Sequence, residues 1–597
     1  MLRSFFASLV LLTLVALPVS AHVGEHPSVH DTVAGIVKRL TESFDAEKLR
    51  SLEPEDVLGI VTEEERHVLA TEHLTFSVNA PVVVSVIRDM RRTDEPFWLE
   101  ERGFRQTKLR VVVEGIDFDV WEREFDAGPI GLGINSIRGR SDHYFVAMRA
   151  QKRRDRSSLE VTDIYPGLHT RGALKEGALP WSDESDRIAS LPADLEGQLF
   201  LRGVDDRKRD ARMVGVFRTT PYPSSAEPDH VTLTWSGDPK TTQTVQWRTS
   251  TATAASAIAF AERDGDVSFN PAGAQQVAAT TKPMRLSTLV NDPVIHRHTA
   301  TITGLSPGTT YQYALSNGQG AWSAEAEFST APAATIPFSF IYMGDAQNGL
   351  ETWGNLIQAS FREKPEAKFY VMAGDLIDRG QERDDWDSYF EKATGVLDRR
   401  QIVPVPGNHE YQGGNAAMYL EMFTLPDSSP VGEQAYTLEY SNALFVMLDS
   451  NIAPHTQTDW LEAQLANSDA TWKFVVYHHP AYSSSPNRNN ARLRKEWGEL
   501  FDKYHVDVAM QGHDHAYLRT YPMFNEKPVG TPKEGTIYIV SVSGTKFYDQ
   551  GDFEYTEFGM TNTSTYQVLD IRIDGNRLEY NAYDVDGTLH DTFVIEK

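Results

Sequence analysis

Two hydrophobic patterns divide the chain. Before about residue 333, apolar and polar residues alternate in short runs such as HLTFSVNAPVVVSVIRD and TQTVQWRTS, which Gly, Asp or Pro turns separate. After residue 336 the apolar runs become continuous, as in FSFIYM, KFYVMA, QIVPVP, ALFVML and KFVVYH, and helical patterns such as TDWLEAQLANS lie between them. Alternating runs are typical of strands with one exposed face, whereas continuous runs indicate strands that are buried on both faces.

These patterns predict a multidomain chain. Residues 22–222 are expected to form a β-rich accessory domain, whose last third is charged and resembles a linker. Residues 226–333 predict a β-sandwich, and the stretch ITGLSPGTTYQYAL within it resembles the end of a fibronectin type III-like module. Residues 336–597 predict an α/β layered domain, in which helices flank a sandwich of buried strands.

The first 21 residues, MLRSFFASLVLLTLVALPVSA, have the basic start, short apolar core and small-residue cleavage site of a secretory signal peptide. The alternative is an N-terminal membrane anchor. No later segment is apolar enough to predict a membrane span. The chain has no cysteine, which favours a bacterial envelope or secreted setting and leaves metal binding to oxygen and imidazole ligands. We therefore expect a secreted or periplasmic protein.

The net charge of −27 arises from 84 acidic and 57 basic residues. Such a surface repels nucleic-acid backbones, so we expect no nucleic-acid partner. A phosphorylated substrate would have to be attracted by local features, such as metal ions or a few arginines.

Chemically active residues follow five of the continuous apolar runs. Each run ends in a short turn, in most cases with glycine, that delivers Asp, Asn or His. The carboxyl ends of strands in α/β sheets line the ligand crevice, so these side chains are expected to converge. Taken singly, each motif is weak, because an isolated Gly-Asp is usually a turn. The ordered set is specific, and it comprises Asp345, Asp375, Asn408, His409, His478, His513 and His515.

This set resembles the metallophosphoesterase (calcineurin-like) superfamily. The text GHDHAYLRTYP, FVMLDSN and VVYHHPAYSSS, together with the preceding fibronectin-like module, is most similar to purple acid phosphatases. The resemblance covers roughly residues 228–597 and does not extend to the accessory domain. It implies a metal-dependent phosphoric ester hydrolase that acts on small phosphorylated substrates.

The resemblance also implies a site for two metal ions, bridged by Asp375. Asp345 and His515 would bind the first ion, and the second would be bound by Asn408, His478 and His513. Such ligands suit Fe, Mn or Zn. Two ions that share a carboxylate generate hydroxide near neutral pH, and this hydroxide would attack phosphorus. His409 matches the family histidine that contacts the phosphoryl group, where it either stabilises the transition state or protonates the leaving oxygen. The alternative is that His409 is a structural residue that supports the metal ligands without contacting substrate.

Three positions depart from the purple acid phosphatase pattern. Asp378 stands where those enzymes carry the tyrosine that binds ferric iron and gives the colour, so we expect no purple centre. Gln347 stands where most of the superfamily has a metal-binding histidine, and it either ligates weakly through its amide oxygen or positions a water. Asn487 and Arg488 replace a histidine pair of plant-type relatives, and they are candidate substrate contacts together with His479. For His479, packing is the alternative role.

The stretch GDLIDRG also resembles the phosphoprotein phosphatases, whose arginine contacts phosphate. Arg379 is therefore a candidate phosphate clamp, since a guanidinium matches the oxygens of a phosphate. The alternative is a solvated arginine or an ion pair with Glu382 or Asp384.

We expect a secreted dinuclear-metal phosphatase that hydrolyses phosphate monoesters. One alternative is a phosphodiesterase or nucleotidase that uses the same site. Another is an envelope binding protein with a degenerate phosphoesterase domain. The complete ligand set disfavours degeneracy, because a decayed site would have lost some of these residues.

Overall fold

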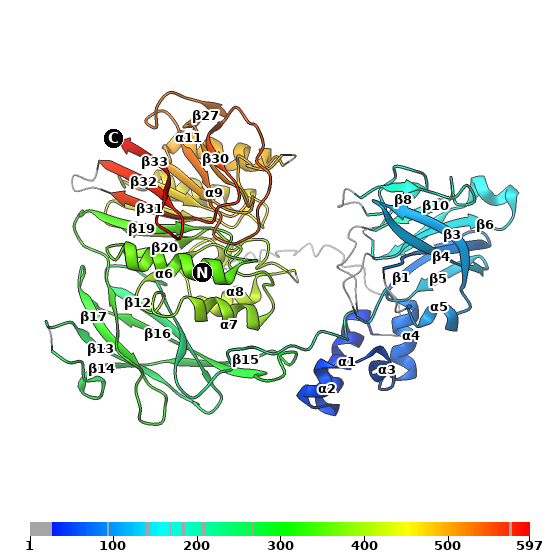
Figure 1. Ribbon diagram of the computed structural model, residues 1–597, viewed down its shortest axis with the longest axis horizontal. Helices are drawn as coiled ribbons and strands as arrows, with labels where there is room; N and C mark the ends of the chain where they lie inside the picture. Colours follow the sequence, from blue (N-terminus) through cyan, green and yellow to red (C-terminus); the bar gives the residue numbers. More distant parts are fainter. Residues whose placement is uncertain are drawn as a thin grey trace, which may run out of the picture. The chain divides into compact units, whose positions relative to one another are not determined.

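The computed structural model describes residues 27–91, 95–138, 143–167, 169–181, 186–203, 211–265, 267–412, 414–486, 488–571 and 576–597. Its contacts divide the chain into two compact units, Met1–Arg218 and Thr219–Lys597. Figure 1 colours the first unit from blue to cyan and the second from green to red. The predicted signal peptide and Asn487 lie outside the described residues.

The N-terminal unit begins with four helices that the β-rich interpretation did not include. They are α1 (Val29–Ser43), α2 (Ala46–Arg50), α3 (Pro54–Leu58) and α4 (Glu63–Thr71). Helix α4 starts with a capping box, because the Thr62 hydroxyl accepts the Glu65 N–H while the Glu65 carboxylate accepts the Thr62 N–H at 2.9 Å. Another short helix, α5 (Trp98–Glu101), follows the second strand.

The rest of the N-terminal unit is β-structure, as the alternating runs predicted. A three-stranded sheet has the order β5-β1-β7, and a seven-stranded sheet has the order β8-β10-β6-β2-β4-β3-β9. The apolar core contains Trp98, whose indole N–H donates to the carbonyl of Ile134 at 2.8 Å. The strands are β1 (Leu74–Val78), β2 (Val82–Asp89), β3 (Arg105–Val113), β4 (Ile116–Phe125), β5 (Gly128–Leu132), β6 (Phe145–Ala150), β7 (Val161–Tyr165), β8 (Thr170–Ala173), β9 (Ile188–Ser190) and β10 (Leu199–Arg202).

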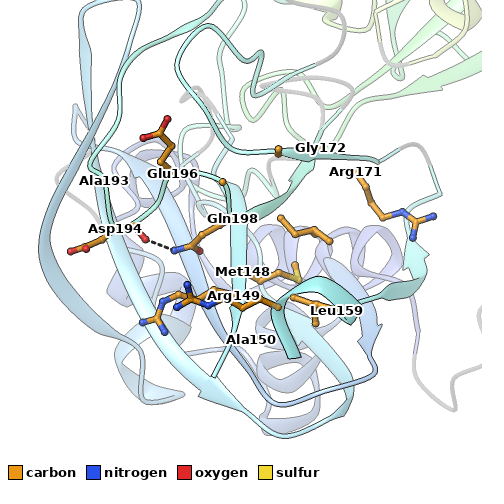
Figure 2. A pocket seen from close by; sticks show the side chains of 14 residues that line it. Met148, Arg149, Ala150, Leu159, Arg171, Gly172, Ala193, Asp194, Glu196 and Gln198 are labelled. Atoms are coloured by element: carbon orange, nitrogen blue, oxygen red, sulfur yellow. Dashed lines mark hydrogen bonds between the residues drawn. The ribbon is translucent and has the colours of Figure 1, made fainter. Parts of the chain in front are cut away.

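A cavity of about 600 Å³ opens beside β6, β8 and β10 of this unit (Figure 2). Its lining mixes charges of both signs, and no residue of the predicted site is among them. In Figure 2 the side chain of Gln198 reaches toward Asp194, and it donates to the backbone carbonyl of that residue at 2.8 Å. The cavity therefore belongs to the accessory unit alone.

The second unit begins with a β-sandwich, as predicted for residues 226–333. Its strands are β11 (Asp229–Thr234), β12 (Thr242–Ser250), β13 (Ala257–Glu262), β14 (Gln275–Ala278), β15 (Thr280–Arg285), β16 (Val294–Thr303), β17 (Thr310–Leu315) and β18 (Ala326–Ser329). A four-stranded sheet, β14-β13-β17-β18, packs against β11, β12 and β16 through a core that includes Trp247, Phe260 and Phe328. Alternating burial along β16 matches the alternating sequence.

The sandwich is fused to the following domain. Strand β11 pairs in parallel with β21 at Leu233 and Gln401, so one sheet runs in the order β15-β16-β12-β11-β21-β20-β19-β31-β32-β33. Buried ion pairs strengthen this junction: the Arg248 guanidinium lies 2.8 Å from Asp387 and also binds Asp229. The sandwich is therefore a fixed structural part of the second unit.

The remaining chain forms the predicted α/β layered domain. Half of the long sheet faces a second sheet of order β22-β23-β24-β25-β29-β26-β30, and the apolar core between them is built from fully buried strands. The strands are β19 (Phe338–Met343), β20 (Phe369–Met372), β21 (Gln401–Pro404), β22 (Tyr436–Tyr440), β23 (Ala443–Met447), β24 (Trp472–Val476), β25 (Val508–Gln511), β26 (Tyr517–Thr520), β27 (Met523–Phe524), β28 (Lys527–Pro528), β29 (Ile537–Val540), β30 (Thr556–Met560), β31 (Tyr566–Ile571), β32 (Arg577–Tyr583) and β33 (Leu589–Glu596).

Helices cover the outer faces of both sheets. Helices α6 (Leu350–Glu363) and α7 (Arg383–Lys392) lie beside the long sheet (Figure 1). They pack together where Trp353 stacks on Tyr389, with ring centroids 4.1 Å apart. The other α-helices of this domain are α8 (Ala417–Met422), α9 (His455–Ala466), α10 (Ala491–Leu493) and α11 (Glu499–Tyr504). Among the described helices, none is long and apolar enough to cross a membrane.

Candidate metal centre

The structure brings the predicted ligands together at the carboxyl ends of the strands. Asp345 follows β19, Asp375 follows β20, Asn408 follows β21, His478 follows β24, and His513 and His515 follow β25. Ligand atoms of Asp375, His478 and His513 all lie within 4.8 Å of one another. The convergence that the strand-end pattern predicted is therefore present.

The backbone is strained where it delivers these side chains. Asp345 and Asp375 both have φ of 52°, and His513 has φ of 73°, in the left-handed region that non-glycine residues rarely adopt. Glycines next to the site permit close approach, because a Cβ on Gly407 would lie 2.1 Å from an oxygen of Asp375. A Cβ on Gly512 would lie 2.3 Å from an oxygen of Asp345. Strain of this kind is retained at sites where geometry serves function.

Electron pairs face one another at the centre of the cluster. Nδ1 of His478 donates to the carbonyl of Ala373 at 2.9 Å, so Nε2 presents its lone pair. Nε2 lies 3.1 Å from Asp375 Oδ2 and 3.1 Å from Asn408 Oδ1, both of which are acceptors. Asn408 Oδ1 in turn lies 2.8 Å from His513 Nδ1. His478 Nε2 and the two oxygens beside it are three acceptors, so a cation or a proton is required among them.

The charges around His478 also favour a cation or a proton at its Nε2. Burial by itself would lower the pKa of His478, but the carboxylates of Asp375 and Asp345 outweigh it and raise that pKa to about 9. Burial opposes ionisation of Asp375 as well, yet the neighbouring imidazoles hold its pKa below the usual value. A metal ion would replace the proton on His478, because both bind the same lone pair.

Asp345, His515 and Gln347 form the other half of the cluster. Asp345 is fully buried, and burial raises its pKa well above the usual value. Its Oδ2 accepts the His513 N–H at 2.7 Å, while its Oδ1 has no hydrogen-bond partner among the described residues. His515 donates from Nδ1 to the carbonyl of Lys546 at 3.2 Å, which leaves Nε2 3.9 Å from Asp345 Oδ1. An unpartnered buried carboxylate oxygen beside an available imidazole nitrogen fits a bound cation.

For Gln347 the sequence left two roles open, weak ligation of a metal through the amide oxygen or positioning of a water. Its side chain is fully buried, its Nε2 is 3.0 Å from His515 Nε2, and its Oε1 has no partner within the described chain. The structure thus places Gln347 against a predicted ligand. Direct ligation and support through His515 both stay predictions.

His409 and Arg379 differ in their orientation toward the centre. The His409 N–H donates to Asp375 Oδ1 at 2.9 Å, and Nδ1 lies 2.5 Å from the carbonyl of Asp378, so Nε2 faces Asp375 Oδ2 at 4.0 Å. His409 therefore borders the cluster with a ring nitrogen free for substrate. The guanidinium of Arg379 instead binds Asp385 at the start of α7.

Among the three predicted substrate contacts, His479 is packed into the cluster. Its ring lies 4.4 Å from that of His513, and its Nδ1 is 2.9 Å from the Ser450 hydroxyl. Burial and the charge of His478 lower its pKa to about 3. Arg488 is partly exposed and binds Asp514 at 2.7 Å, while Asn487 is not among the described residues.

Two buried carboxylates that the sequence analysis missed hold the ligand loops in place. Glu410 accepts backbone N–H groups of Gly407 at 2.7 Å and of Asp375 and Leu376 at 2.9 Å each. Burial and the charge of Asp375 raise the pKa of Glu410 to about 7, against the pull of these donors. Asp514 accepts the Ser484 N–H at 2.8 Å and thereby ties the loop after His478 to the loop of His513. Both carboxylates lie inside motifs that the sequence analysis had noted, Glu410 in GNHE and Asp514 in GHDH, and this position was the signal that could have identified them.

Family models match both parts of the second unit. Residues 228–330 match the purple acid phosphatase N-terminal domain, and residues 338–517 match the calcineurin-like phosphoesterase model. The second unit therefore contains a calcineurin-like phosphoesterase domain. Within it, the sequence combines the two domains in the order found in purple acid phosphatases, which confirms the resemblance inferred from the motifs.

Relatives and a solved structure agree with this placement. Purple acid phosphatase 21 of Arabidopsis thaliana is 26% identical over 38% of this chain and 54% of its own length. Probable inactive purple acid phosphatase 1 of the same plant is 24% identical over 50% of this chain and 57% of its own. The chain thus spans about half the length of these relatives. A purple acid phosphatase from yellow lupin seeds shares the fold, with a TM-score of 0.53 and 16% identity over 79% of this chain and 82% of that one.

Proposed function

We propose that this chain is a dinuclear-metal phosphatase that hydrolyses phosphate monoesters. The observation that supports this best is the approach of Asp375, His478 and His513 within 4.8 Å, at the predicted strand ends of a metallophosphoesterase fold. The imidazole and carboxylate donors suit Fe, Mn or Zn.

The donors make two sets of contacts, which supports two ions, with Asp375 as the carboxylate that we propose to bridge them. One set is Asp345 and His515, with Gln347 in contact with His515. The other is Asn408, His478 and His513. Metal ions held by these sets would supply a Lewis acid for the phosphoryl oxygens and a water of lowered pKa.

The residues of the chain itself have distinct roles in this proposal. Glu410 and Asp514 fix the loops, so that the ligands are oriented before substrate arrives. His409 presents Nε2 toward the space beside Asp375, where it would give a proton to the departing alcohol oxygen. Burial of the ligands excludes bulk water from the charges that develop there.

We also propose that the protein acts outside the cytoplasm, as a secreted or periplasmic enzyme. The support is the signal-peptide pattern of residues 1–21 and the absence of cysteine. Fractionation of the native host would test this, and cytoplasmic retention with an intact leader would contradict it.

The central test combines metal content with turnover. The purified full chain should bind two metal ions and hydrolyse p-nitrophenyl phosphate faster than bis(p-nitrophenyl) phosphate. Asp375→Asn should lose metal and at least about a thousandfold in kcat/KM, because it removes the charge shared by both sets. Asp469→Asn, at an exposed carboxylate between α9 and β24, is the matched control.

Each alternative predicts a different result in this experiment. Faster turnover of the diester would replace the monoesterase proposal with a phosphodiesterase. Fewer than two ions under every loading condition, without turnover of either ester, would instead indicate a degenerate binding protein. The second outcome is relevant because one relative is named as inactive.

A further inference from the structure

Two cations flank a tyrosine beside the metal centre, and the proposed reaction gives them no role. The Arg488 guanidinium carbon and the Lys546 ammonium each lie 5.2 Å from the centre of the Tyr548 ring. We call Arg488, Lys546 and Tyr548 the rim cluster. Cations at this distance are attracted to the electron-rich face of the ring, so Tyr548 holds two positive charges near one point.

Backbone contacts attach the rim cluster directly to predicted ligands. The Tyr548 N–H donates to the carbonyl of His515 at 2.9 Å, and the two rings lie 4.8 Å apart in an edge-on arrangement. The carbonyl of Lys546 accepts Nδ1 of the same histidine at 3.2 Å. The guanidinium of Arg488 reaches the carbonyl of His513 at 3.4 Å. The cluster is therefore positioned by the same loops as the metal ligands.

The charges of the two cations are not equally neutralised. Arg488 binds the buried carboxylate of Asp514 at 2.7 Å, which offsets one positive charge. The ammonium of Lys546 has no ion pair or hydrogen bond within the described chain, although the side chain is only half exposed. The protein as a whole is acidic, with a net charge of −27, so the unpaired positive charge of Lys546 contrasts with the rest of the surface.

We propose that the rim cluster binds a second phosphoryl group of the substrate, so that compounds with two linked phosphates are the preferred substrates of this enzyme. The inference rests on the proposed phosphatase function. An ammonium and a guanidinium are the groups that recognise phosphate oxygens. Since the Tyr548 ring is already in contact with two cations, it positions charge rather than stacking on a nucleobase.

The reaction on such a substrate is a hydrolysis. The oxygen of one water forms a bond to the terminal phosphorus, and the bond from that phosphorus to the bridging oxygen breaks. The bridging oxygen keeps the electron pair and leaves on the second phosphate, which the rim cluster holds. One water proton stays on the oxygen that joins the terminal phosphorus, the other goes to the departing phosphate or to solvent, and no oxidant or other co-reactant is needed.

The test compares inorganic pyrophosphate with p-nitrophenyl phosphate as substrates of the metal-loaded full chain. Lys546→Met removes the charge and keeps the stem, Lys546→Arg restores a cation, and Lys527→Met alters an exposed lysine on β28 as the control. In Lys546→Met we expect kcat/KM for pyrophosphate to fall about tenfold, through KM, and kcat/KM for p-nitrophenyl phosphate to change less than about twofold. Lys546→Arg should recover most of the loss.

Equal losses on both substrates, or no loss on pyrophosphate, would overturn the inference while leaving the phosphatase proposal intact. If the unaltered protein hydrolyses neither compound, the phosphatase proposal fails, and calorimetric binding then decides on the rim cluster. Tighter binding of pyrophosphate than of phosphate, weakened in Lys546→Met, would support it. Equal affinities would reject it.

Discussion

Nε of Arg379 lies 2.8 Å from Oδ2 of Asp385, and a second N–H of the same guanidinium donates to the other carboxylate oxygen. This bidentate pair connects the GDLIDRG loop to the first turn of α7. The sequence left Arg379 open between a phosphate clamp and an ion pair with Glu382 or Asp384. The structure gives it Asp385 as its main partner, with Asp384 farther away at 3.9 Å.

The first prediction concerns this pair. In Arg379→Gln we expect KM for p-nitrophenyl phosphate to stay within about threefold, while the free energy of unfolding falls by about 1 kcal/mol, because a partly exposed ion pair is lost. Steady-state kinetics and urea denaturation measure the two effects. Arg362→Gln, which removes a more exposed pair with Glu363 on α6, is the control. A tenfold or greater rise in KM, absent from the control, would show that Arg379 acts as the phosphate clamp.

The second prediction concerns Glu410, which positions the ligand loops without contacting substrate. Glu410→Gln replaces a carboxylate oxygen with an amide N–H that faces backbone donors of Gly407, Asp375 and Leu376. We expect metal affinity and kcat/KM each to fall about 10–100-fold, with an unchanged far-ultraviolet circular dichroism spectrum. Glu421→Gln, on an exposed face of α8, should bind metal as the unaltered chain does. Unchanged metal affinity in Glu410→Gln would rule out the positioning role.

The ligands were predictable from sequence because each follows a buried strand. A continuous apolar run such as FSFIYM is typical of a strand covered on both faces, and parallel strands bring their ends to one edge. The strand-end positions of Asp375 and His478 are therefore readable locally, whereas their predicted role as ligands depends on the ordered set of motifs and the family resemblance. The role of Glu410 is different, since it depends on donors from a loop 34 and 35 positions earlier. Nothing local to GNHE specifies those partners.

The N-terminal unit was only partly predictable for a related reason. Helices α2 and α3 have five residues each, too few for a clear 3.6-residue period. The capping box of Thr62 and Glu65 was a readable signal for α4. The charged stretch taken as a linker contributes β7, β8, β9 and β10. Of these, β7, β8 and β9 are edge strands, which carry few apolar residues on their exposed faces. The fusion of β11 with β21 is a tertiary pairing without a local pattern.

The third prediction tests the buried junction between the sandwich and α7. Arg248 is 1% exposed and binds Asp229 and Asp387. Arg248→Met removes this cation from both carboxylates and leaves Asp387 with the longer contact to Arg383 at 3.5 Å. We expect the free energy of unfolding to fall by about 3–5 kcal/mol. Arg263→Met removes a more exposed pair with Glu327 in the same sandwich and should cost less than about 1 kcal/mol. Equal losses in the two variants, measured by urea denaturation, would contradict a stabilising role for the junction.

The fourth prediction concerns the pH dependence of stability in the sandwich, far along the chain from the metal ligands. His298 is fully buried and its ring nitrogens contact the hydroxyls of Thr249 and Thr281 at 2.8 and 2.9 Å. Burial, followed by the charges of His296 and Arg297, lowers its pKa to about 4. The unfolded chain, with an ordinary histidine pKa of about 6.5, therefore takes up a proton at a pH where the folded chain does not.

This difference in proton uptake determines how the free energy of unfolding changes with pH. His298 contributes little pH dependence above pH 6.5, and it favours unfolding progressively as the pH falls from 6.5 toward 4. Between pH 7 and pH 5 the unaltered protein should lose about 2 kcal/mol more unfolding free energy than His298→Gln. Urea denaturation of both proteins at the two pH values gives this quantity. Other histidines titrate in both proteins and cancel in the difference, so parallel pH profiles would show that His298 does not remain neutral in the folded state.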